Sequence, residues 1–297
     1  MFEGFDLRSA RVADEVCLRF RVGGDGPPVV LLHGHPRTHT TWHQVAPQLA
    51  VGGLTVVCPD LRGYGRSSAP PPRKDHAQAS KRAMAHDVVT LMDQLGHDQF
   101  AVVGHDRGSY VACRLALDHP DRVTALVVLD SVAIAEALAR ADARFAQAWW
   151  HWFFLAQPEI PERVINADPD AWYGAGADLQ ARMGTDNYAD YQTAIHDPNV
   201  VLAMIEDYRA GLGADRAADE ADRATGRTIT CPTTVAWSTL DDMENLYGDP
   251  LRVWRPWTAA LSGRRVHSGH HMAEQAPNEL AELLLEALLP VRRTMTK

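Results

Sequence analysis

The sequence predicts an α/β fold, in which a mostly parallel, doubly wound sheet is interrupted by an inserted helical cap. Three observations predict it. Short apolar runs alternate with helical segments along most of the 297 residues. The alternation stops between residues 131 and 227, where the chain is helix-prone. Strand patterns resume at Thr228, so the helical stretch lies between two strands of one sheet.

Several short apolar runs are predicted to be the buried strands of this sheet. Each is brief and rich in β-branched residues. Helices cover both faces of a parallel sheet, so its strands are apolar at consecutive positions. The predicted strands are Pro28–Leu32, Leu54–Cys58, Phe100–Val103, Ala125–Leu129 and Thr233–Trp237, with a further strand at Arg264–His267.

Three helices are predicted around these strands. Ser80–Leu95 has apolar residues at helical spacing. Gly108–Asp118 runs into His119-Pro120, which is typical of a helix end. Gln275–Leu288 is rich in Ala, Glu and Leu, and its Pro277 suits a first turn.

The stretch without strand signals is predicted to form the cap. It is rich in alanine, and three tryptophans lie close together near its start. We therefore expect a core at residues 1–130, a helical cap at residues 131–227 and the second part of the core at residues 228–297.

Composition excludes some classes of partner. The 29 basic and 38 acidic residues give a net charge of −9, and no Lys/Arg cluster indicates nucleic-acid binding. The N-terminal segment has neither a signal-peptide core nor a membrane-spanning stretch. The cysteines are Cys17, Cys58, Cys113 and Cys231. They form no CxxC pair, so we expect reduced thiols in a cytoplasmic protein. We expect its partner to be a small-molecule substrate.

The segment Gly104–Gly108 (GHDRG) carries the sharpest chemical signal. It lies directly after a predicted strand and before a predicted helix, and it resembles the nucleophile elbow of the α/β-hydrolase fold. The small residues are needed because the turn is sharp. The nucleophile position holds Asp106 rather than serine. The alternative role for Asp106 is a simple helix N-cap.

An aspartate at this position constrains the reaction. A serine that attacks a saturated carbon leaves an ether, which water does not readily cleave. A carboxylate leaves an ester, which activated water hydrolyses at the carbonyl carbon. Asp106 therefore indicates displacement at carbon, as in dehalogenation or epoxide opening.

The general base is predicted to be His270, which follows the last predicted strand. His271 is the neighbouring alternative. An acid should orient the histidine. Asp130 ends one strand and Asp241 follows the next, and position alone does not separate them. The three histidines of this loop lack metal-ligand spacing, so we expect neither a metal nor a cofactor.

The loop His33-Gly34-His35-Pro36 follows a buried strand and matches the HGxP loop that supplies an oxyanion hole. The backbone N–H groups of His35 and Arg107 are the predicted donors. They would hold the carbonyl oxygen of Asp106 during ester hydrolysis.

With these motifs assembled, the chain resembles the fluoroacetate (haloacetate) dehalogenase family of α/β hydrolases along nearly its whole length. The most specific segments are GHDRG at 104–108, ALDHP at 116–120, HWFF at 151–154, DYRAG at 207–211 and the His270 loop. The resemblance implies that Asp106 is the nucleophile, that Asp130 is the orienting acid and that His270 is the base. It also implies a homodimer.

The resemblance further implies how a substrate is held. Arg107 would bind the substrate carboxylate, and the cap residues His151, Trp152 and Tyr208 would cradle the leaving halide, since each offers a hydrogen-bond donor. One position departs from the family. Its second carboxylate-binding arginine, four residues after the nucleophile, is Tyr110 here. A hydrogen bond to a charged group contributes about 1.5–3 kcal/mol, so the substrate carboxylate would be held more weakly.

These residues predict hydrolysis of the carbon–halogen bond in a small 2-haloacid. The first alternative is an epoxide hydrolase with the same Asp and His. That class usually has Trp where Arg107 stands and two cap tyrosines; Tyr208 is a candidate for one, and Phe154 occupies the position of the other. The second alternative is a non-catalytic binding protein of the same fold.

Overall fold

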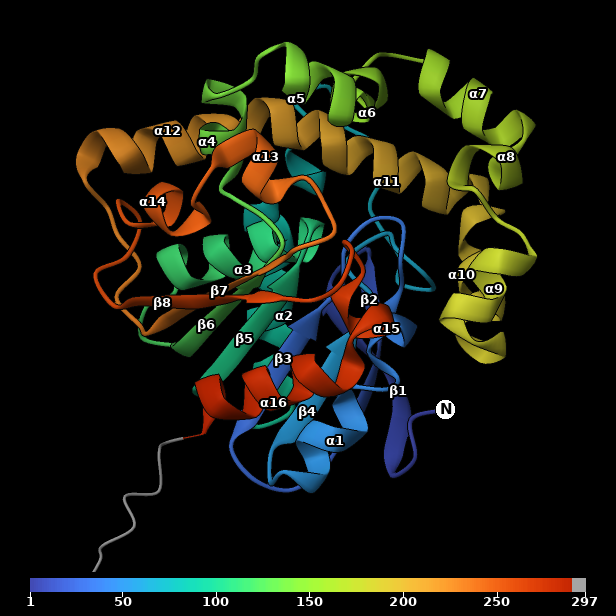
Figure 1. Ribbon diagram of the computed structural model, residues 1–297. Helices are drawn as coiled ribbons and strands as arrows, with labels where there is room; N and C mark the ends of the chain where they lie inside the picture. The colour runs from blue at the N-terminus through green and yellow to red at the C-terminus, as the bar shows by residue number, and fades with distance from the viewer. Residues whose placement is uncertain (290–297) are drawn as a thin grey trace, which may run out of the picture.

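The computed structural model describes residues 1–289, which form a single eight-stranded sheet with helices on both faces (Figure 1). The strand order is β1-β2-β4-β3-β5-β6-β7-β8. Pairs from β4 through β3 to β8 are parallel, whereas β1–β2 and β2–β4 are antiparallel. The strands are β1 (Phe5–Ala13), β2 (Val16–Gly23), β3 (Pro28–Leu32), β4 (Thr55–Pro59), β5 (Phe100–His105), β6 (Val123–Leu129), β7 (Thr233–Ser238) and β8 (Leu261–Val266).

The predicted mostly parallel α/β sheet with a helical insertion is thereby confirmed. In β3, Val30 and Leu32 pack into the core on one face, and Val29 and Leu31 pack into the core on the other. This two-sided burial explains the continuous apolar runs. Strands β1 and β2 were not predicted, because β1 is largely exposed and β2 alternates between buried and half-buried positions, so neither has a continuous apolar run.

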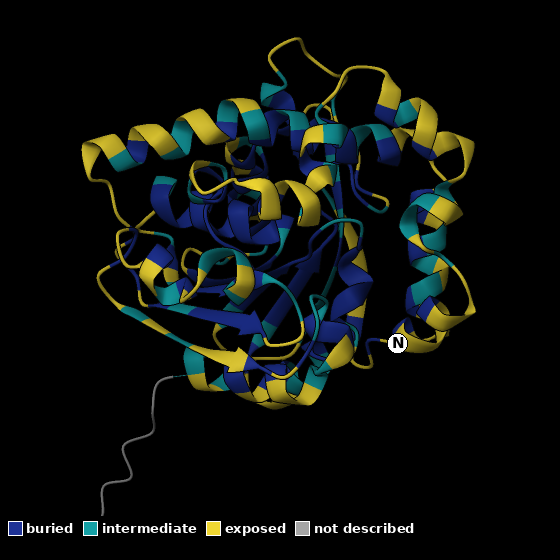
Figure 2. Cartoon of the chain, turned by 45° about the horizontal axis from the view of Figure 1, so that its top comes forward, coloured by how far each residue is buried: buried dark blue, intermediate teal, exposed yellow. Residues whose placement is uncertain are grey.

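Two pairs of helices cover the two faces of the sheet. α2 (Lys81–Gln94) and α3 (Arg107–Asp118) pack together on one face, and α1 (Ala46–Val51) and α16 (Pro277–Leu288) pack together on the other. The predicted helices thus form within two residues of the expected bounds. α2 begins after Ser80, whose hydroxyl accepts the Ala83 N–H as an N-cap. The central strands are dark blue in Figure 2, whereas the edge strands and the outer helix faces carry yellow and teal.

The insertion between β6 and β7 is entirely helical. Its long helix consists of α11, a π-helical segment (Gly211–Asp215) and α12, and it runs along the top of the view in Figure 1. The inserted helices are α4 (Ile134–Ala139), α5 (Ala143–Ala148), α6 (Trp150–Leu155), α7 (Ile160–Ala167), α8 (Pro169–Tyr173), α9 (Ala177–Met183), α10 (Thr185–Ile195), α11 (Pro198–Ala210) and α12 (Arg216–Thr225).

The remaining helices belong to the loops after β7 and β8. They are α13 (Met243–Tyr247), α14 (Pro250–Trp254) and α15 (Met272–Gln275), with short 3-10 turns at His39–Trp42 and Ala77–Ala79. Within residues 1–289, every helix is too short or too polar to span a bilayer. All four cysteines are unpaired; three are buried, and Cys17 on β2 is half-buried.

The turn between β5 and α3 depends on two glycines. A Cβ on Gly104 would lie 2.4 Å from the Gly108 carbonyl oxygen, and a Cβ on Gly108 would lie 2.4 Å from the Leu32 carbonyl oxygen. Both contacts are to backbone, which has little freedom to move aside. The two glycines therefore allow α3 to start directly against β3.

We expect Gly108→Ala to lower the free energy of unfolding by about 1–3 kcal/mol, because the added methyl group overpacks a rigid site. Urea denaturation measures this change. Gly213→Ala is the matched control, because a Cβ there meets no atom within 4 Å. Equal stability of the two variants would contradict the steric role of Gly108.

Candidate active site

Asp106 occupies the tip of the turn between β5 and α3. Its backbone has φ 50° and ψ −118°, a conformation that is strained for a non-glycine residue. The turn projects the carboxylate beyond the end of the sheet. A Cβ on Gly34 would lie 2.4 Å from the Asp106 Cβ and Oδ1 atoms, so only glycine fits beside this side chain.

One backbone amide contacts the Asp106 carboxylate, and a second lies next to it in the chain. The His35 N–H donates to Oδ1 at 2.7 Å. Arg107 is the first residue of α3, and the N–H groups of a first helical turn have no intrahelical acceptor. The two amides predicted as oxyanion donors therefore flank Asp106, one in direct contact with its carboxylate.

His270 faces three carboxylates. Its Nε2 lies 3.7 Å from Asp106 Oδ2. Its Nδ1 lies 2.8 Å from Asp130 Oδ2 and 3.3 Å from Asp241 Oδ2. The structure thus brings both predicted orienting acids to the same nitrogen. Asp130 is further held by Ser238, whose N–H and hydroxyl each donate to it at 2.9 Å.

This arrangement polarises the site. Burial opposes a charge on the imidazole, but the hydrogen bond to Asp130 and the nearby carboxylates of Asp106 and Asp241 outweigh it and raise the pKa of His270 well above its usual value. Burial likewise opposes ionisation of Asp106, but His270 outweighs it and lowers the pKa of that carboxyl group. The two shifts both favour an Asp106 carboxylate opposite a His270 imidazolium in the resting site.

His271, the alternative base, has different surroundings. Its Nδ1 is buried without a hydrogen-bond partner, and it forms no ion pair within residues 1–289. Burial lowers its pKa well below the ordinary value. The geometry therefore favours His270 over His271 as the group that titrates beside Asp106.

A cavity of about 280 Å³ opens between Asp106 and the inserted helices. Asp106 and His270 form its floor, and helices α5, α6 and α11 contribute its other side. The lining residues are His35, Asp106, Ala148, Trp149, His151, Trp152, Tyr208, Asp241, Asp242 and His270. All three residues predicted to cradle a halide are among them.

These three cap side chains lie close together. The His151 and Tyr208 rings are 5.9 Å apart, and the Trp152 and Tyr208 rings are 6.4 Å apart. Burial lowers the pKa of His151 to about 4, so its imidazole is neutral at pH 7. The cavity wall therefore combines a neutral imidazole, an indole and a phenol, each with a donor group.

The Arg107 guanidinium is fully buried and already paired. Its Nε donates to Asp207 Oδ2 at 3.0 Å, and its Nη2 donates to Asp207 Oδ1 at 2.9 Å and to the Asp207 carbonyl at 2.8 Å. The Tyr208 ring packs over it at 4.2 Å. Arg107 does not line the cavity, and Nη1 is its one buried nitrogen without a partner among the described residues.

Tyr110 lies beside Arg107, with 5.3 Å between the guanidinium carbon and the ring centre. Its hydroxyl is buried without a partner among the described residues, and it too lies outside the cavity lining. Arg114, one turn further along α3, points elsewhere and pairs with Asp222 at 2.6 Å and Asp219 at 2.8 Å. We call the cavity side formed by His151, Trp152 and Tyr208 the aromatic wall. The predicted carboxylate-binding residues thus lie behind this wall and do not line the cavity.

Sequence reasoning missed the residues that support the site. Asp207 accepts hydrogen bonds from Arg107 and from the Tyr64 hydroxyl (2.7 Å), and it also pairs with Lys81. Its only sequence signal was its place directly before Tyr208 in the DYRAG segment. Ser238, which holds Asp130, carried no signal at all.

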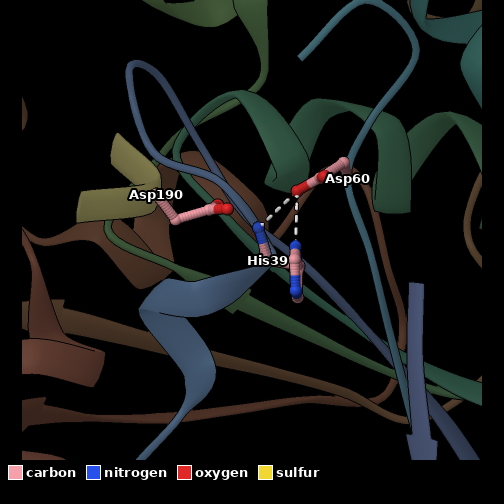
Figure 3. A group of neighbouring side chains, drawn as sticks. All are labelled: His39, Asp60 and Asp190. Atoms are coloured by element: carbon pink, nitrogen blue, oxygen red, sulfur yellow. Dashed lines mark hydrogen bonds and ion pairs between the residues drawn. The ribbon is translucent and has the colours of Figure 1, made fainter. Parts of the chain in front are cut away.

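A second group of potential ligand side chains lies away from the cavity. Figure 3 shows His39 and Asp60 directed at one another, with Asp190 nearby. Asp60 Oδ1 accepts the backbone N–H of His39 at 2.8 Å. The Nδ1 atom of the His39 ring lies 2.7 Å from the same oxygen. Asp190 accepts the Thr38 hydroxyl at 2.7 Å. Because these donors already use the carboxylate oxygens, the group supports the loop after β3.

The chain is similar to known proteins over most of its length. The model of the alpha/beta hydrolase fold family matches residues 27–277. The chain belongs to this family. A fluoroacetate dehalogenase from Burkholderia sp is 41% identical over 98% of this chain and 96% of its own length. The resemblance to that family is thereby confirmed.

Two further proteins are similar to this chain over most of its length. A soluble epoxide hydrolase from Corynebacterium sp. (strain C12) is 29% identical over 93% of this chain and 94% of its own. The solved structure of ALR0039 from Nostoc sp PCC 7120 has a TM-score of 0.92 at 39% identity, covering 97% of this chain and 99% of that one. The chain is an α/β hydrolase of the dehalogenase and epoxide hydrolase group.

The Asp207 carboxylate pairs with the buried Arg107 and Lys81 side chains, and its loss would leave the Arg107 guanidinium without a charged partner among the described residues. We expect Asp207→Asn to lower the free energy of unfolding by about 3–5 kcal/mol. Urea denaturation gives the value. Asp98→Asn is the control, because that side chain is 98% exposed. A change below about 1 kcal/mol in Asp207→Asn, the range of a surface pair, would contradict this role.

Proposed function

We propose that the protein hydrolyses the carbon–halogen bond of a small 2-haloacid, of the haloacetate type. One observation carries the proposal: the elbow residue is an aspartate whose Oδ1 accepts the His35 N–H and whose Oδ2 faces His270. The 41% identity to a fluoroacetate dehalogenase supports it.

The first step is displacement at the α-carbon. Asp106 Oδ1 is occupied by the His35 N–H, so Oδ2 is the oxygen free to attack. The new carbon–oxygen bond forms as the carbon–halogen bond breaks, and the halide leaves with the bonding electrons. The depressed pKa of Asp106 keeps the nucleophile ionised at neutral pH.

The departing halide needs hydrogen-bond donors. His151, Trp152 and Tyr208 line the cavity opposite Asp106. A neutral His151 still offers one N–H, and no acceptor among the described residues takes the Trp152 indole N–H or the Tyr208 hydroxyl hydrogen. The three groups are therefore free to solvate a small anion.

The second step is hydrolysis of the Asp106 ester. Ester formation removes the charge of Asp106, which is one of the carboxylates that hold the proton on His270. The imidazolium then releases its proton to solvent more readily. Neutral Nε2 takes a proton from water as the water attacks the ester carbonyl carbon. The His35 and Arg107 N–H groups stabilise the oxyanion. As it collapses, the bond between the ester carbonyl carbon and the substrate oxygen breaks, and the leaving alkoxide takes the proton from His270 Nε2 to give the 2-hydroxyacid. The Asp106 carboxyl group then ionises and returns a proton to His270 or to solvent.

Epoxide hydrolysis is the second candidate. It is favoured by Tyr208, which lines the cavity and whose phenol could protonate an opening epoxide oxygen, and by the epoxide hydrolase relative, which covers nearly the same length. The buried pairing of Arg107 with Asp207 also leaves the cavity lining without an arginine or lysine. A panel of haloacetates and styrene oxide, assayed for halide and for diol, separates the two activities.

We expect His270→Gln to accumulate the alkyl-enzyme, because displacement needs only Asp106 whereas ester hydrolysis needs the base. Intact-protein mass spectrometry after chloroacetate exposure should show one added carboxymethyl group, and peptide mapping should place it on Asp106. Asp106→Asn is the control and should remain unmodified. An unmodified His270→Gln protein would exclude this mechanism for chloroacetate, and it would favour a binding role or another substrate.

Tyr110 tests how the substrate carboxylate is held. We expect Tyr110→Arg to lower KM for chloroacetate by about ten- to a hundredfold, because it adds a charged hydrogen-bond donor. Steady-state halide release measures KM. Tyr110→Phe is the matched control and removes only a hydroxyl without a protein partner. An unchanged KM in Tyr110→Arg, with the fold intact by circular dichroism, would show that the carboxylate binds elsewhere.

A further inference from the structure

Two carboxylates from different strands share one nitrogen of His270. Asp130 follows β6 and Asp241 follows the neighbouring strand β7. Their Oδ2 atoms lie 2.8 Å and 3.3 Å from Nδ1. Ligand atoms of the three side chains all lie within 4.8 Å of one another. A single orienting acid would satisfy the one hydrogen on Nδ1, so the second carboxylate needs its own explanation.

The two acids have different surroundings. The Asp130 side chain is 1% exposed, its backbone φ is 52°, and Ser238 holds both of its carboxylate oxygens. The Asp241 side chain is 34% exposed and lines the cavity. Among the described residues, His270 is the only cationic group within ion-pair distance of Asp241. Asp241 is therefore directed at the imidazole, and no second cation among the described residues competes for its carboxylate.

The reaction changes the charge around His270. Before alkylation, Asp106 faces Nε2 while Asp130 and Asp241 face Nδ1. After alkylation, Asp106 is a neutral ester. Only the two acids on Nδ1 then remain to stabilise the imidazolium that forms when His270 takes a proton from water. A second acid matters most at that point.

We propose that Asp241 is a second positioning residue for His270 and shares the Nδ1 hydrogen with Asp130 during ester hydrolysis. The inference rests on the proposed function for its kinetic consequence, but its structural content does not. It assigns one base to two acids at the ends of adjacent strands.

Several other charged or titratable groups surround the imidazole. His105 lies on β5, and its ring centre is 4.8 Å from that of His270; His271 lies next in sequence, with its ring centre at 5.2 Å. Asp242 in the loop after β7 and His151 in the cap interact electrostatically with the His270 imidazole. Of these four, only Asp242 is an acid, and it lies outside ion-pair distance of the ring. Among the described residues, the carboxylates in ion-pair contact with the ring are therefore those of Asp106, Asp130 and Asp241. The nearby His270 imidazole lowers the pKa of Asp241, as expected for a partner of the imidazolium.

A double-mutant cycle tests the sharing. In Ser-His-Asp enzymes, disabling the orienting acid costs roughly 10⁴-fold in rate. Here we expect Asp130→Asn and Asp241→Asn each to slow ester hydrolysis less than that, by about a hundredfold and about tenfold respectively. The double variant should lose more than the product of the two single losses, because each acid substitutes for the other. Pre-steady-state halide release, which reports alkylation, serves as the internal reference.

The pH profile separates positioning from a merely structural effect. Removing a carboxylate from Nδ1 destabilises the imidazolium, so His270 loses its proton at a lower pH. The acidic limb of ester hydrolysis should therefore move to lower pH in Asp241→Asn by about one unit. Asp241→Glu should restore the wild-type profile. Asp98→Asn, an exposed surface variant, should leave both rate and profile unchanged.

A titration without substrate keeps the inference independent of the proposed function. NMR of protein with isotope-labelled histidine follows the His270 imidazole, which is assigned by its loss in His270→Gln. The His270 pKa should fall in Asp241→Asn. An unchanged pKa, or a double variant whose loss equals the product of the single losses, would overturn the role of Asp241. An absent Asp106 adduct would overturn only the proposed function.

Discussion

The Asp106 carboxylate, held at positive φ between a buried strand and a buried helix, sets the position of the rest of the site. The turn is possible because Gly104 and Gly108 let α3 start against β3, and because Gly34 leaves room beside the carboxylate. Once Asp106 projects beyond the sheet, the His35 N–H meets one of its oxygens and His270 faces the other. The strain of the turn is small against the packing of a sheet that is buried on both faces.

Two sets of charged side chains lie on opposite sides of the aromatic wall of His151, Trp152 and Tyr208. In front of it, three carboxylates surround His270 and make the resting site an ion pair. Behind it, Arg107 pairs with Asp207 of α11, and Asp207 also pairs with Lys81 of α2. The second set joins the inserted helices to the core, as do the ion pairs of Arg114 with α12. The π-helical segment contributes directly, since a Cβ on its Gly211 would lie 2.9 Å from Arg107 Nη2.

The charges also bear on substrate choice. An anionic substrate must approach a cavity lined by Asp106, Asp241 and Asp242, and the nearest guanidinium is already neutralised by Asp207. Arg107 Nη1 is the one donor on that group left for a substrate carboxylate, and Tyr110 adds at most a neutral hydrogen bond. For the proposed haloacid substrate, we therefore expect weaker carboxylate binding than two free arginines would give. His151, Trp152 and Tyr208, which the resemblance implies as halide-binding residues, all line the cavity.

Local sequence determined the order of strands and helices, the elbow with Asp106, the HGxP loop and His270, because each depends on a short pattern of apolar, small or polar residues. The edge strands β1 and β2 escaped prediction because strands with one face toward solvent lack a continuous apolar run. Tertiary structure alone decided the partners of the charged groups. Asp130 and Asp241 both follow strands that end at the same edge, and only the paths of their loops show that both reach His270. Asp207 meets Arg107 across 100 residues of chain, a pairing that no local pattern encodes.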